Sequence, residues 1–453
     1  MTLDELATRR VAVWGVGQEG RGITRLLVER GAPVVLVDDR PEAAEQAALE
    51  LDVPTRPITP DVLADTDIEV VVRSPGVSRY RTELLDVERA GVEVTTPMAV
   101  WLEDFADARV LAVTGTKGKS TTSALAAAIL AAGGTDVALI GNIGVPVTDT
   151  YGQPRSGAYV VEVSSYQGAD VTATPPVCVL TSLAPDHLDW HRGLEQYYRD
   201  KLRLIEAGPI GELAVNAASE EAVLRTTEHP RRTLFGPAGQ VRLGPEGVVE
   251  VDGEPLADTG RLRVPGVHNR WNLCGAVAGV MLLEGRPPTR GAVESAMDGF
   301  EALPSRCHVI GERDSLTYVD DALASNPFAT AASIEAFAGR DLTVIVGGAD
   351  RGVAPTDLVE ALRAHRPVPR LVVLPPDPSR LVDSVYSTPG SDAPVIEVRL
   401  AEDLTGAVAL AAASTPSGGV VLFSPGAPTP EGEGGFAVRS GIFREAAGLS
   451  GAT

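Results

Sequence analysis

The sequence predicts an α/β fold of three consecutive domains, the first and third Rossmann-like and the second a P-loop ATPase-like unit. Short apolar runs alternate with helix-forming stretches along the chain, which is the pattern of doubly wound parallel sheets. Two of these runs lead into glycine-rich turns, at residues 15–20 and 115–120. The 453 residues are enough for about three domains of ordinary size.

The first predicted domain covers residues 1–97. Apolar runs at 11–14, 34–37, 70–72 and 92–94 indicate strands, and apolar side chains at 23, 26 and 27 indicate a helix. The turn at 15–20 fits G-x-G-x-x-G, and Asp38 ends the second strand, which together are a weak dinucleotide-binding signal. A glycine loop at a helix N-terminus binds any diphosphate, so a nucleotide-bearing substrate is the alternative to NAD.

The second predicted domain, residues 98–301, contains the most informative motif. Residues 113–122 read Val-Thr-Gly-Thr-Lys-Gly-Lys-Ser-Thr-Thr, between an apolar strand at 110–113 and a helix at 123–130. In such a loop backbone N–H groups cradle phosphates, Lys119 can reach the outer phosphates, and the Ser120 hydroxyl can hold magnesium. Further strands are expected at 158–163 and 177–181, a small β excursion between 232 and 263, and a helix at 272–283.

The third predicted domain, residues 302–453, contains three apolar runs that indicate parallel strands, at 342–348, 371–374 and 419–423. A parallel arrangement fits the alternation of these runs with helix-forming stretches.

The composition of the chain excludes several classes of function. The formal net charge of −22 argues against a nucleic-acid or anionic-membrane binder, because either needs a basic face. The three cysteines, Cys178, Cys274 and Cys307, are far apart, which suits a reducing compartment and argues against structural zinc or disulfides. Neither a signal peptide nor a membrane-spanning segment is recognisable, so we expect a cytoplasmic enzyme.

Several further motifs follow one another along the chain. They are Ser-Pro-Gly at 74–76, Gly-Asn-Ile-Gly at 141–144, Glu-Val-Ser-Ser-Tyr-Gln at 162–167, Asp-His-Leu-Asp at 186–189, Lys201, Gly-Val-His-Asn at 266–269 with Asn272, and Leu-Pro-Ser-Arg at 303–306. With the two glycine loops, and in this order, they resemble the Mur ligases of peptidoglycan synthesis, a pathway of cell shape and division. Within that family the resemblance is to the branch that adds glutamate to UDP-N-acetylmuramoyl-L-alanine, and it spans nearly the whole chain.

The resemblance implies an ATP-dependent amide ligase: ATP phosphorylates the alanyl carboxylate, and the amine of glutamate then displaces phosphate from the acyl phosphate. The residues implied to bind ATP are Gly115, Thr116, Lys117, Gly118, Lys119, Ser120, Thr121, Asn269, Asn272, Arg306 and Asp321. Those implied to bind the UDP-substrate are Gly17, Gln18, Glu19, Gly20, Asp38, Asp39, Arg40, Ser74, Pro75, Gly76 and Asn142. Those implied to bind the incoming amino acid are Ser325, Arg351, Thr429 and Phe436, with Arg439 nearby.

The resemblance also assigns catalytic roles to Lys119, Glu162, His187 and Lys201. Ser120 and Glu162 would ligate one Mg²⁺ and His187 a second, and Lys201, carbamylated by CO₂, would supply a further metal ligand. Judged without the resemblance, Glu162 could be a strand-end surface residue, and a lone histidine is more often structural than a ligand. The sequence around Lys201, Tyr-Tyr-Arg-Asp-Lys-Leu-Arg, then favours an ordinary position on the surface of a helix.

The sequence departs from the usual glutamate-adding pattern in the third domain. Leu323 stands where those enzymes have a lysine in Asp-Ser-Lys-Ala-Thr-Asn, Arg351 follows the Gly-Gly turn in place of another lysine, and Ser305 replaces a histidine. Leucine cannot pair with a carboxylate, and arginine is not equivalent to lysine. We therefore expect the variant branch that adds L-glutamate, with D-glutamate as the alternative.

Other classes fit less well. An NAD-dependent oxidoreductase would leave the Gly-Lys-Ser loop unexplained, and a folate-type polyglutamate ligase would lack the first domain. Other Mur ligases add alanine, a diamino acid or a dipeptide, and a non-catalytic scaffold would have no need of Glu162, His187 and Lys201. The expected partners are UDP-N-acetylmuramoyl-L-alanine, glutamate and an epimerase that acts on the product, and a monomer is expected.

Overall fold

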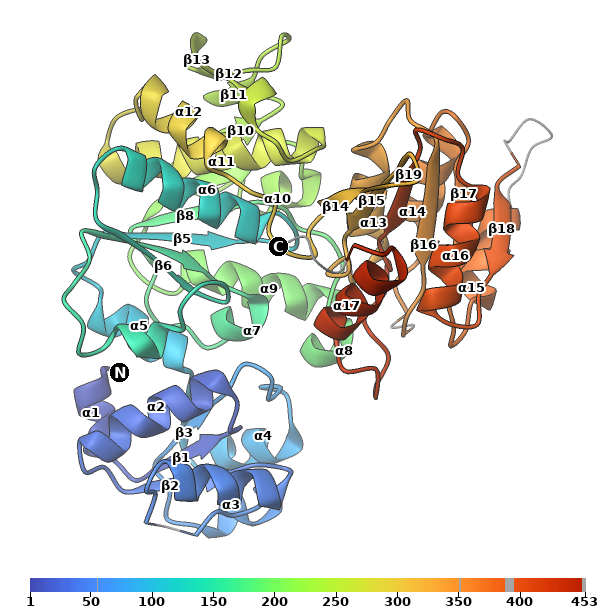
Figure 1. The fold of residues 1–453 in the computed structure, drawn as a ribbon. Helices are drawn as coiled ribbons and strands as arrows, with labels where there is room; N and C mark the ends of the chain where they lie inside the picture. The colour runs from blue at the N-terminus through green and yellow to red at the C-terminus, as the bar shows by residue number, and fades with distance from the viewer. Residues whose placement is uncertain (55, 350–351, 388–394, 450–453) are drawn as a thin grey trace. The chain divides into compact units, whose positions relative to one another are not determined.

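The structure is a computed structural model that describes residues 1–54, 56–349, 352–387 and 395–449. These residues form three sheets, of four, nine and six strands, with helices on their faces (Figure 1). They group into two compact units: Met1–Thr259 with Trp271–Ala296, and Gly260–Arg270 with Met297–Thr453. The predicted α/β class is confirmed, whereas the domain limits 1–97, 98–301 and 302–453 stay a prediction.

The first sheet is parallel and has the order β2-β1-β3-β4. Its strands β1, β2 and β3 are buried on both faces, which is why the sequence there is an unbroken apolar run. The strands are β1 (Val11–Trp14), β2 (Val34–Val37), β3 (Val70–Arg73) and β4 (Glu93–Thr95), and the helices are α1 (Leu3–Ala7), α2 (Gln18–Glu29), α3 (Pro41–Glu50), η1 (Pro60–Asp65) and α4 (Thr82–Arg89).

The second sheet has the order β13-β12-β11-β10-β9-β8-β5-β7-β6. Its strands are β5 (Val110–Thr114), β6 (Val137–Gly141), β7 (Ala158–Glu162), β8 (Val177–Leu180), β9 (Glu212–Asn216), β10 (Arg232–Gly236), β11 (Val241–Leu243), β12 (Val248–Val251) and β13 (Glu254–Asp258). The predicted β excursion is thus β10 to β13, which extend the central sheet at one edge. β6 and β9 were not predicted, and β6 lies at the opposite edge, where a half-buried strand needs no long apolar run.

Helices cover both faces of this sheet, and Figure 1 shows α6 and α9 on opposite sides of β5. Tyr197, Leu202 and Ile205 of α9 pack in one core with Ala112 of β5 and Val161 of β7. The helices are α5 (Pro97–Asp104), α6 (Lys119–Ala132), η2 (Val147–Thr150), α7 (Ser165–Gly168), α8 (Leu188–His191), α9 (Leu194–Glu206), α10 (Glu220–Arg225), η3 (Thr259–Arg261), α11 (Val267–Glu284) and α12 (Arg290–Asp298).

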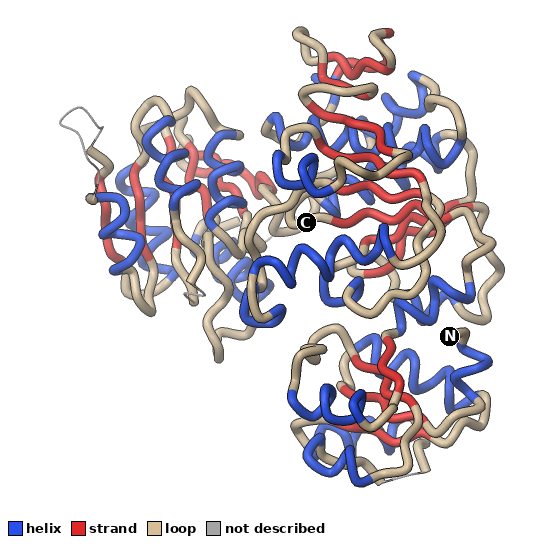
Figure 2. The backbone as a smooth tube through the Cα atoms, turned by 180° about the vertical axis from the view of Figure 1, so that it is seen from behind, coloured by secondary structure: helices blue, strands red, loops and turns tan. Residues whose placement is uncertain are grey.

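The third sheet has the order β14-β15-β19-β16-β17-β18 and is parallel except for the β14–β15 hairpin. The three predicted runs are β16 (Leu342–Val346), β17 (Arg370–Val373) and β19 (Val420–Phe423), whereas β14 (His308–Arg313), β15 (Leu316–Asp320) and β18 (Glu397–Leu400) were not predicted. Two apolar cores flank the sheet, and Figure 2 shows its strands between helices. The helices are α13 (Pro327–Glu335), α14 (Thr356–Ala364), α15 (Ser379–Tyr386), α16 (Leu404–Ser414) and α17 (Phe436–Ala446).

Among the described residues, no helix combines the length and the apolar character that crossing a bilayer requires.

Candidate active site

The loop between β5 and α6 has the geometry of a phosphate cradle. Gly115 and Gly118 have φ of +144° and +88°, a region that favours glycine. A Cβ on Gly115 would lie 2.0 Å from Thr181 Oγ1, and one on Gly118 would lie 2.4 Å from Asn272 Oδ1. Gly118 is also the N-cap of α6, where unpaired backbone N–H groups attract an anion.

The segment after β8 fixes this loop in place. The Thr181 hydroxyl donates to the Lys117 carbonyl at 2.6 Å, and the Lys117 N–H donates to Ser182 Oγ at 2.9 Å. The ammonium of Lys119 donates to the Thr116 carbonyl at 3.0 Å, so it already lies over the loop. The cradle is therefore formed by hydrogen bonds of the protein itself.

Three polar atoms around the loop are buried and, among the described residues, have no hydrogen-bond partner: Ser120 Oγ, Glu162 Oε2 and His187 Nδ1. Ser120 begins α6, Glu162 ends β7, and His187 follows β8 at φ +51°. β7, β5 and β8 are neighbouring parallel strands, so their carboxyl ends meet at one edge of the sheet. Buried hydroxyl, carboxylate and imidazole atoms without partners are what a divalent cation site would leave in the protein alone.

The imidazole of His187 has the protonation state that metal ligation requires. Burial lowers the pKa of His187 to about 4, which keeps the imidazole neutral near neutral pH. Asn142 Nδ2 donates to the other oxygen of Glu162, Oε1, at 2.6 Å and so orients the carboxylate. Within the described ranges, no three His, Cys, Asp or Glu side chains gather as a metal site, so a cation here would need further oxygen atoms from a ligand or water.

Lys201 is not a surface residue, and the interpretation drawn from the residues alone is wrong. Its side chain on α9 is 2% exposed, and Nζ donates to the Gly115 carbonyl at 2.9 Å. Burial, and then the charge of Lys119, lower the pKa of this amine well below its usual range. The signal was present in the sequence, because Tyr197, Lys201 and Ile205 are four residues apart and share the buried face of α9.

The lysines of the chain are concentrated at this site. The sequence contains three lysines, Lys117, Lys119 and Lys201. Lysine and arginine together number 39, so arginine supplies nearly all of the permanent positive charge. Lys117 Nζ lies 3.5 Å from Asp186 Oδ2, beside His187. All three lysines thus lie on or against the phosphate loop.

The glycine turn after β1 forms a second candidate anion site. Gly15 is at φ +95°, and a Cβ on Gly20 would lie 1.8 Å from the Gly15 carbonyl, so the turn requires both glycines. Ser74 Oγ donates to that same carbonyl at 2.7 Å. By contrast, a Cβ on Gly17 or Gly76 would meet nothing within 4 Å, which leaves open space beside both loops.

Three acidic residues predicted to bind the UDP-substrate, Glu19, Asp38 and Asp39, differ in their surroundings. Asp38 is buried, which opposes its ionisation, but hydrogen bonds from the Arg40 and Val16 amides hold its pKa below the usual value. Asp39 pairs with Arg81 at 2.7 Å. Glu19 accepts a hydrogen bond from Gln167, and burial raises its pKa to about 7.

In the second unit, Asp321 organises the turn that carries Arg306. Its Oδ1 accepts from the Cys307 N–H at 3.0 Å, and its Oδ2 accepts from Ser333 and Ser424 at 2.6 and 2.7 Å. Asp321 is buried and Arg306 is half-buried. The nucleotide contacts of both residues stay predictions. The same holds for Asn269, whose side-chain amide donates to the Pro265 carbonyl at 2.6 Å.

The residues predicted to bind the incoming amino acid also lie in the second unit. Ser325 and Thr429 are half-buried, and Phe436 is exposed at the start of α17. Arg439 is instead buried and donates to the Gly347 carbonyl at 3.0 Å, so in this structure it supports the turn after β16. Arg351 lies outside the described residues.

The fold and these loops define a P-loop α/β nucleotide-binding enzyme with a second glycine-rich loop after β1. Residues 113–280 match the family model of the Mur ligase middle domain, and residues 9–96 match that of the MurD-like N-terminal domain of Mur ligases. The chain belongs to the Mur ligase family of ATP-dependent, amide-forming ligases, as the order of its motifs predicts.

Full-length relatives support this assignment. The UDP-N-acetylmuramoyl-L-alanine–L-glutamate ligases of Micromonospora sp. and Salinispora tropica are each 39% identical, over 98% of this chain and 98% and 99% of theirs. The ligase of that name from Xanthomonas axonopodis pv. citri is 35% identical over 99% of this chain and 97% of its own. The MurF ligase of Thermotoga maritima, solved with ADP, shares the fold with a TM-score of 0.62 at 17% identity, over 98% of each chain.

Proposed function

We propose that this enzyme joins L-glutamate to UDP-N-acetylmuramoyl-L-alanine at the expense of ATP, in the synthesis of peptidoglycan precursors. The observation that carries the proposal is the buried Lys201 amine, 2.9 Å from the Gly115 carbonyl of the phosphate loop. It supports carboxylate activation by ATP, and the full-length relatives named for L-glutamate support the choice of amino acid.

In the proposed reaction the alanyl carboxylate attacks the γ-phosphorus of ATP, and the bond to ADP breaks. The glutamate amine then attacks the acyl carbon, phosphate leaves with the C–O electron pair, and the amine gives up a proton. Every reactant is an anion, so neutralisation of charge and positioning dominate the barrier. Lys119 and the N-terminus of α6 supply positive charge on the phosphate side.

Mg²⁺ fits the residues that face the loop, because Ser120 Oγ, Glu162 Oε2 and His187 Nδ1 are buried and, in the described part of the chain, have no hydrogen-bond partner. Ser120 and Glu162 would hold one ion and His187 a second. Bound Mg²⁺ would supply charge neutralisation to the phosphate oxygens. Asn142 keeps the Glu162 carboxylate oriented.

The Lys201 amine is suited to carbamylation. Its lowered pKa favours the neutral amine, whose lone pair can form a C–N bond with CO₂ as one proton is released. The carbamate would replace a buried cation beside Lys119 with an anion, which relieves like-charge repulsion and provides a metal ligand.

L-Glutamate is favoured over D-glutamate by the third-domain sequence as well as by the relatives. Leu323 is half-buried and offers no charge to a carboxylate where the usual enzymes have lysine. An inverted Cα would move the α-carboxylate while the side-chain carboxylate could stay near Ser325, Thr429 and Phe436. The product would then be the substrate of a separate epimerase, and we place the enzyme in the cytoplasm as a monomer.

The proposal is tested by phosphate release from ATP in the presence of UDP-N-acetylmuramoyl-L-alanine and one glutamate enantiomer at a time. We expect release with L-glutamate that depends on all three substrates. Release with D-glutamate and none with L-glutamate would overturn the stereochemical part. No release with either enantiomer would overturn the proposal as a whole.

A further inference from the structure

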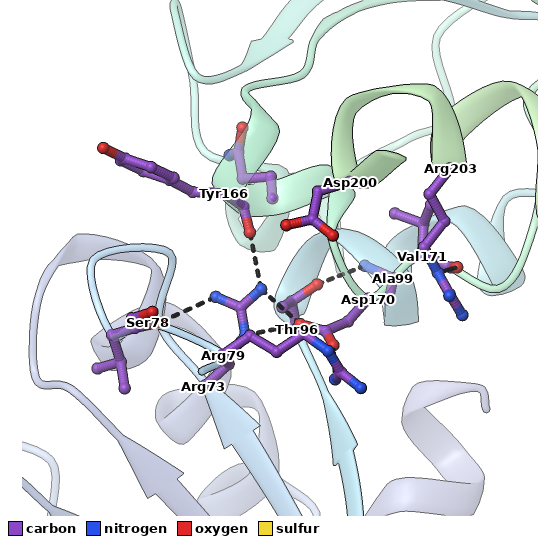
Figure 3. A network of polar contacts seen from close by, with 12 residues as sticks. Arg73, Ser78, Arg79, Thr96, Ala99, Tyr166, Asp170, Val171, Asp200 and Arg203 are labelled. Atoms are coloured by element: carbon purple, nitrogen blue, oxygen red, sulfur yellow. Dashed lines mark hydrogen bonds and ion pairs between the residues drawn. The ribbon is translucent and has the colours of Figure 1, made fainter. Parts of the chain in front are cut away.

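The loop that follows β3 and the end of that strand contact α7, α8 and α9, which contain or adjoin Glu162, His187 and Lys201. This loop, residues 74–81, begins with the Ser74-Pro75-Gly76 turn predicted to bind the UDP-substrate. Figure 3 shows the guanidinium of Arg73, at the end of β3, reaching Asp170 and the Tyr166 carbonyl. Arg73 is fully buried, and it also donates to the Val77 carbonyl at 3.1 Å.

One contact from this loop leads directly to α9. The Tyr80 hydroxyl donates to both carboxylate oxygens of Asp200, at 2.7 and 2.8 Å. Asp200 is the residue immediately before Lys201, and both are buried on α9. A shift of Tyr80 therefore acts on the helical turn from which the Lys201 amine reaches Gly115.

Asp200 is held from two further directions. His191 Nδ1 lies 2.6 Å from its Oδ2, and Gln196 Nε2 donates to its Oδ1 at 2.8 Å. The other ring nitrogen of His191, Nε2, lies 2.9 Å from Ser165 Oγ, at the start of α7. Ser165 comes three residues after Glu162. The network thus joins α7, α8 and α9, the elements next to Glu162, His187 and Lys201.

We infer that Tyr80 and Asp200 are positioning residues that couple occupancy of the UDP-substrate loop to the placement of the Lys201 amine at the phosphate loop. Neither side chain is required to touch a reacting atom. Substrate bound at residues 74–76 would fix Tyr80, Tyr80 would fix Asp200, and α9 would then hold Lys201 against Gly115. The inference rests on the proposed function, because it takes the loop ligand to be a UDP-linked substrate.

The composition of the chain makes a direct test possible. With three lysines, protein labelled with ¹³C at lysine Cε gives three side-chain signals, and Lys201→Arg identifies the one from Lys201. The probe is UDP-N-acetylglucosamine, which carries the UDP-sugar but no alanyl arm, added with saturating ADP so that the phosphate loop is already filled. We expect the probe to change the Lys201 signal of the wild-type protein.

Tyr80→Phe keeps the ring and removes the hydroxyl. We expect this variant to bind the probe by calorimetry while its Lys201 signal no longer responds, and to have a kcat about tenfold lower at an unchanged KM for ATP, the scale of one lost hydrogen bond to a buried carboxylate. Ser78→Ala is the matched control, because it removes a 2.8 Å hydrogen bond to the Trp190 carbonyl and a 3.3 Å hydrogen bond from the Tyr80 N–H but keeps the Tyr80 hydroxyl on Asp200. Its Lys201 signal should respond as in the wild type.

The inference would be overturned by a Lys201 signal that responds equally in Tyr80→Phe and wild type, or by one that does not respond in wild type although the probe is bound. An equal loss of response in Ser78→Ala would likewise assign the effect to the loop as a whole. If wild-type protein binds no UDP-sugar and no UDP-N-acetylmuramoyl-L-alanine, the proposed function fails and the inference with it.

Discussion

The side-chain amine of Lys201 donates a hydrogen bond to the carbonyl oxygen of Gly115 across 2.9 Å, although 86 positions separate the two residues. This contact joins α9 to the phosphate loop. It places a buried amine of lowered pKa against the loop predicted to bind the phosphates of ATP. A buried, unmodified lysine next to Lys119 is electrostatically unfavourable, which is consistent with its use in chemistry.

Lys201→Ala should abolish ligation while ADP binding persists, because the phosphate cradle itself is held by Thr181 and Ser182. If the active form is the carbamate, acetate or another short carboxylate should restore part of the activity by occupying the vacated volume. Phosphate release with and without added carboxylate measures both effects. Wild-type activity in the variant would show that Lys201 has no catalytic role.

Gly118→Ala should weaken nucleotide binding tenfold or more, because the new Cβ would lie 2.4 Å from Asn272 Oδ1 at a φ of +88°. Gly134→Ala is the matched control: Gly134 has the same φ, and a Cβ there would meet nothing within 4 Å. The control should lose about 1 kcal/mol of stability but bind ADP normally. Equal ADP affinities of Gly118→Ala and wild type would contradict the proposed role of this glycine.

The stability of the protein should depend on pH through Glu19, whose pKa burial raises from 4.5 to about 7. Between these values the unfolded carboxyl loses its proton while the folded one keeps it, so the free energy of unfolding falls as the pH rises. The loss should reach about 3 kcal/mol by pH 8. Glu19→Gln removes this titration.

Urea unfolding at pH 5 and pH 8 measures the Glu19 effect. Relative to wild type, Glu19→Gln should gain stability at the higher pH. The same substitution at the exposed Glu42 of α3 provides the control and should leave the pH dependence unchanged. Parallel pH profiles of Glu19→Gln and wild type would show that Glu19 titrates as it does in the unfolded chain.

Arg73→Met should destabilise the first unit by about 3 kcal/mol, because among the described residues it leaves buried Asp170 with Arg79 as its ion-pair partner and removes the bonds to Tyr166 and Val77. Arg155→Met, which breaks an exposed pair with Asp107 at 2.6 Å, should change the unfolding midpoint little. Similar midpoints for the two variants would mean that the buried network contributes no net stability.

The sequence predicted much of the site because the chemistry is local there. Gly115, Gly118, Lys119 and Ser120 are adjacent, and a phosphate cradle needs glycine and lysine at that spacing. The parallel strands β1, β2, β5, β8, β16 and β19 were predictable because burial on both faces requires an unbroken apolar run.

What could not be predicted depends on distant partners or on edges. β14 and β18 lie at the two edges of the third sheet, where polar residues are tolerated. The bond from Tyr80 to Asp200 spans 120 positions and leaves no local pattern. The residues alone place Lys201 wrongly at the surface, because its charge outweighs its position on the buried face of α9, whereas the family resemblance gives it a catalytic role.

The stereochemistry of the added glutamate is tested most directly when both enantiomers compete in one reaction. The enzyme is given UDP-N-acetylmuramoyl-L-alanine, ATP and equal amounts of unlabelled L-glutamate and deuterated D-glutamate, and the mass of the product is measured. We predict a product with the unlabelled mass that forms only with ATP. A product that carries the deuterium label would contradict the account.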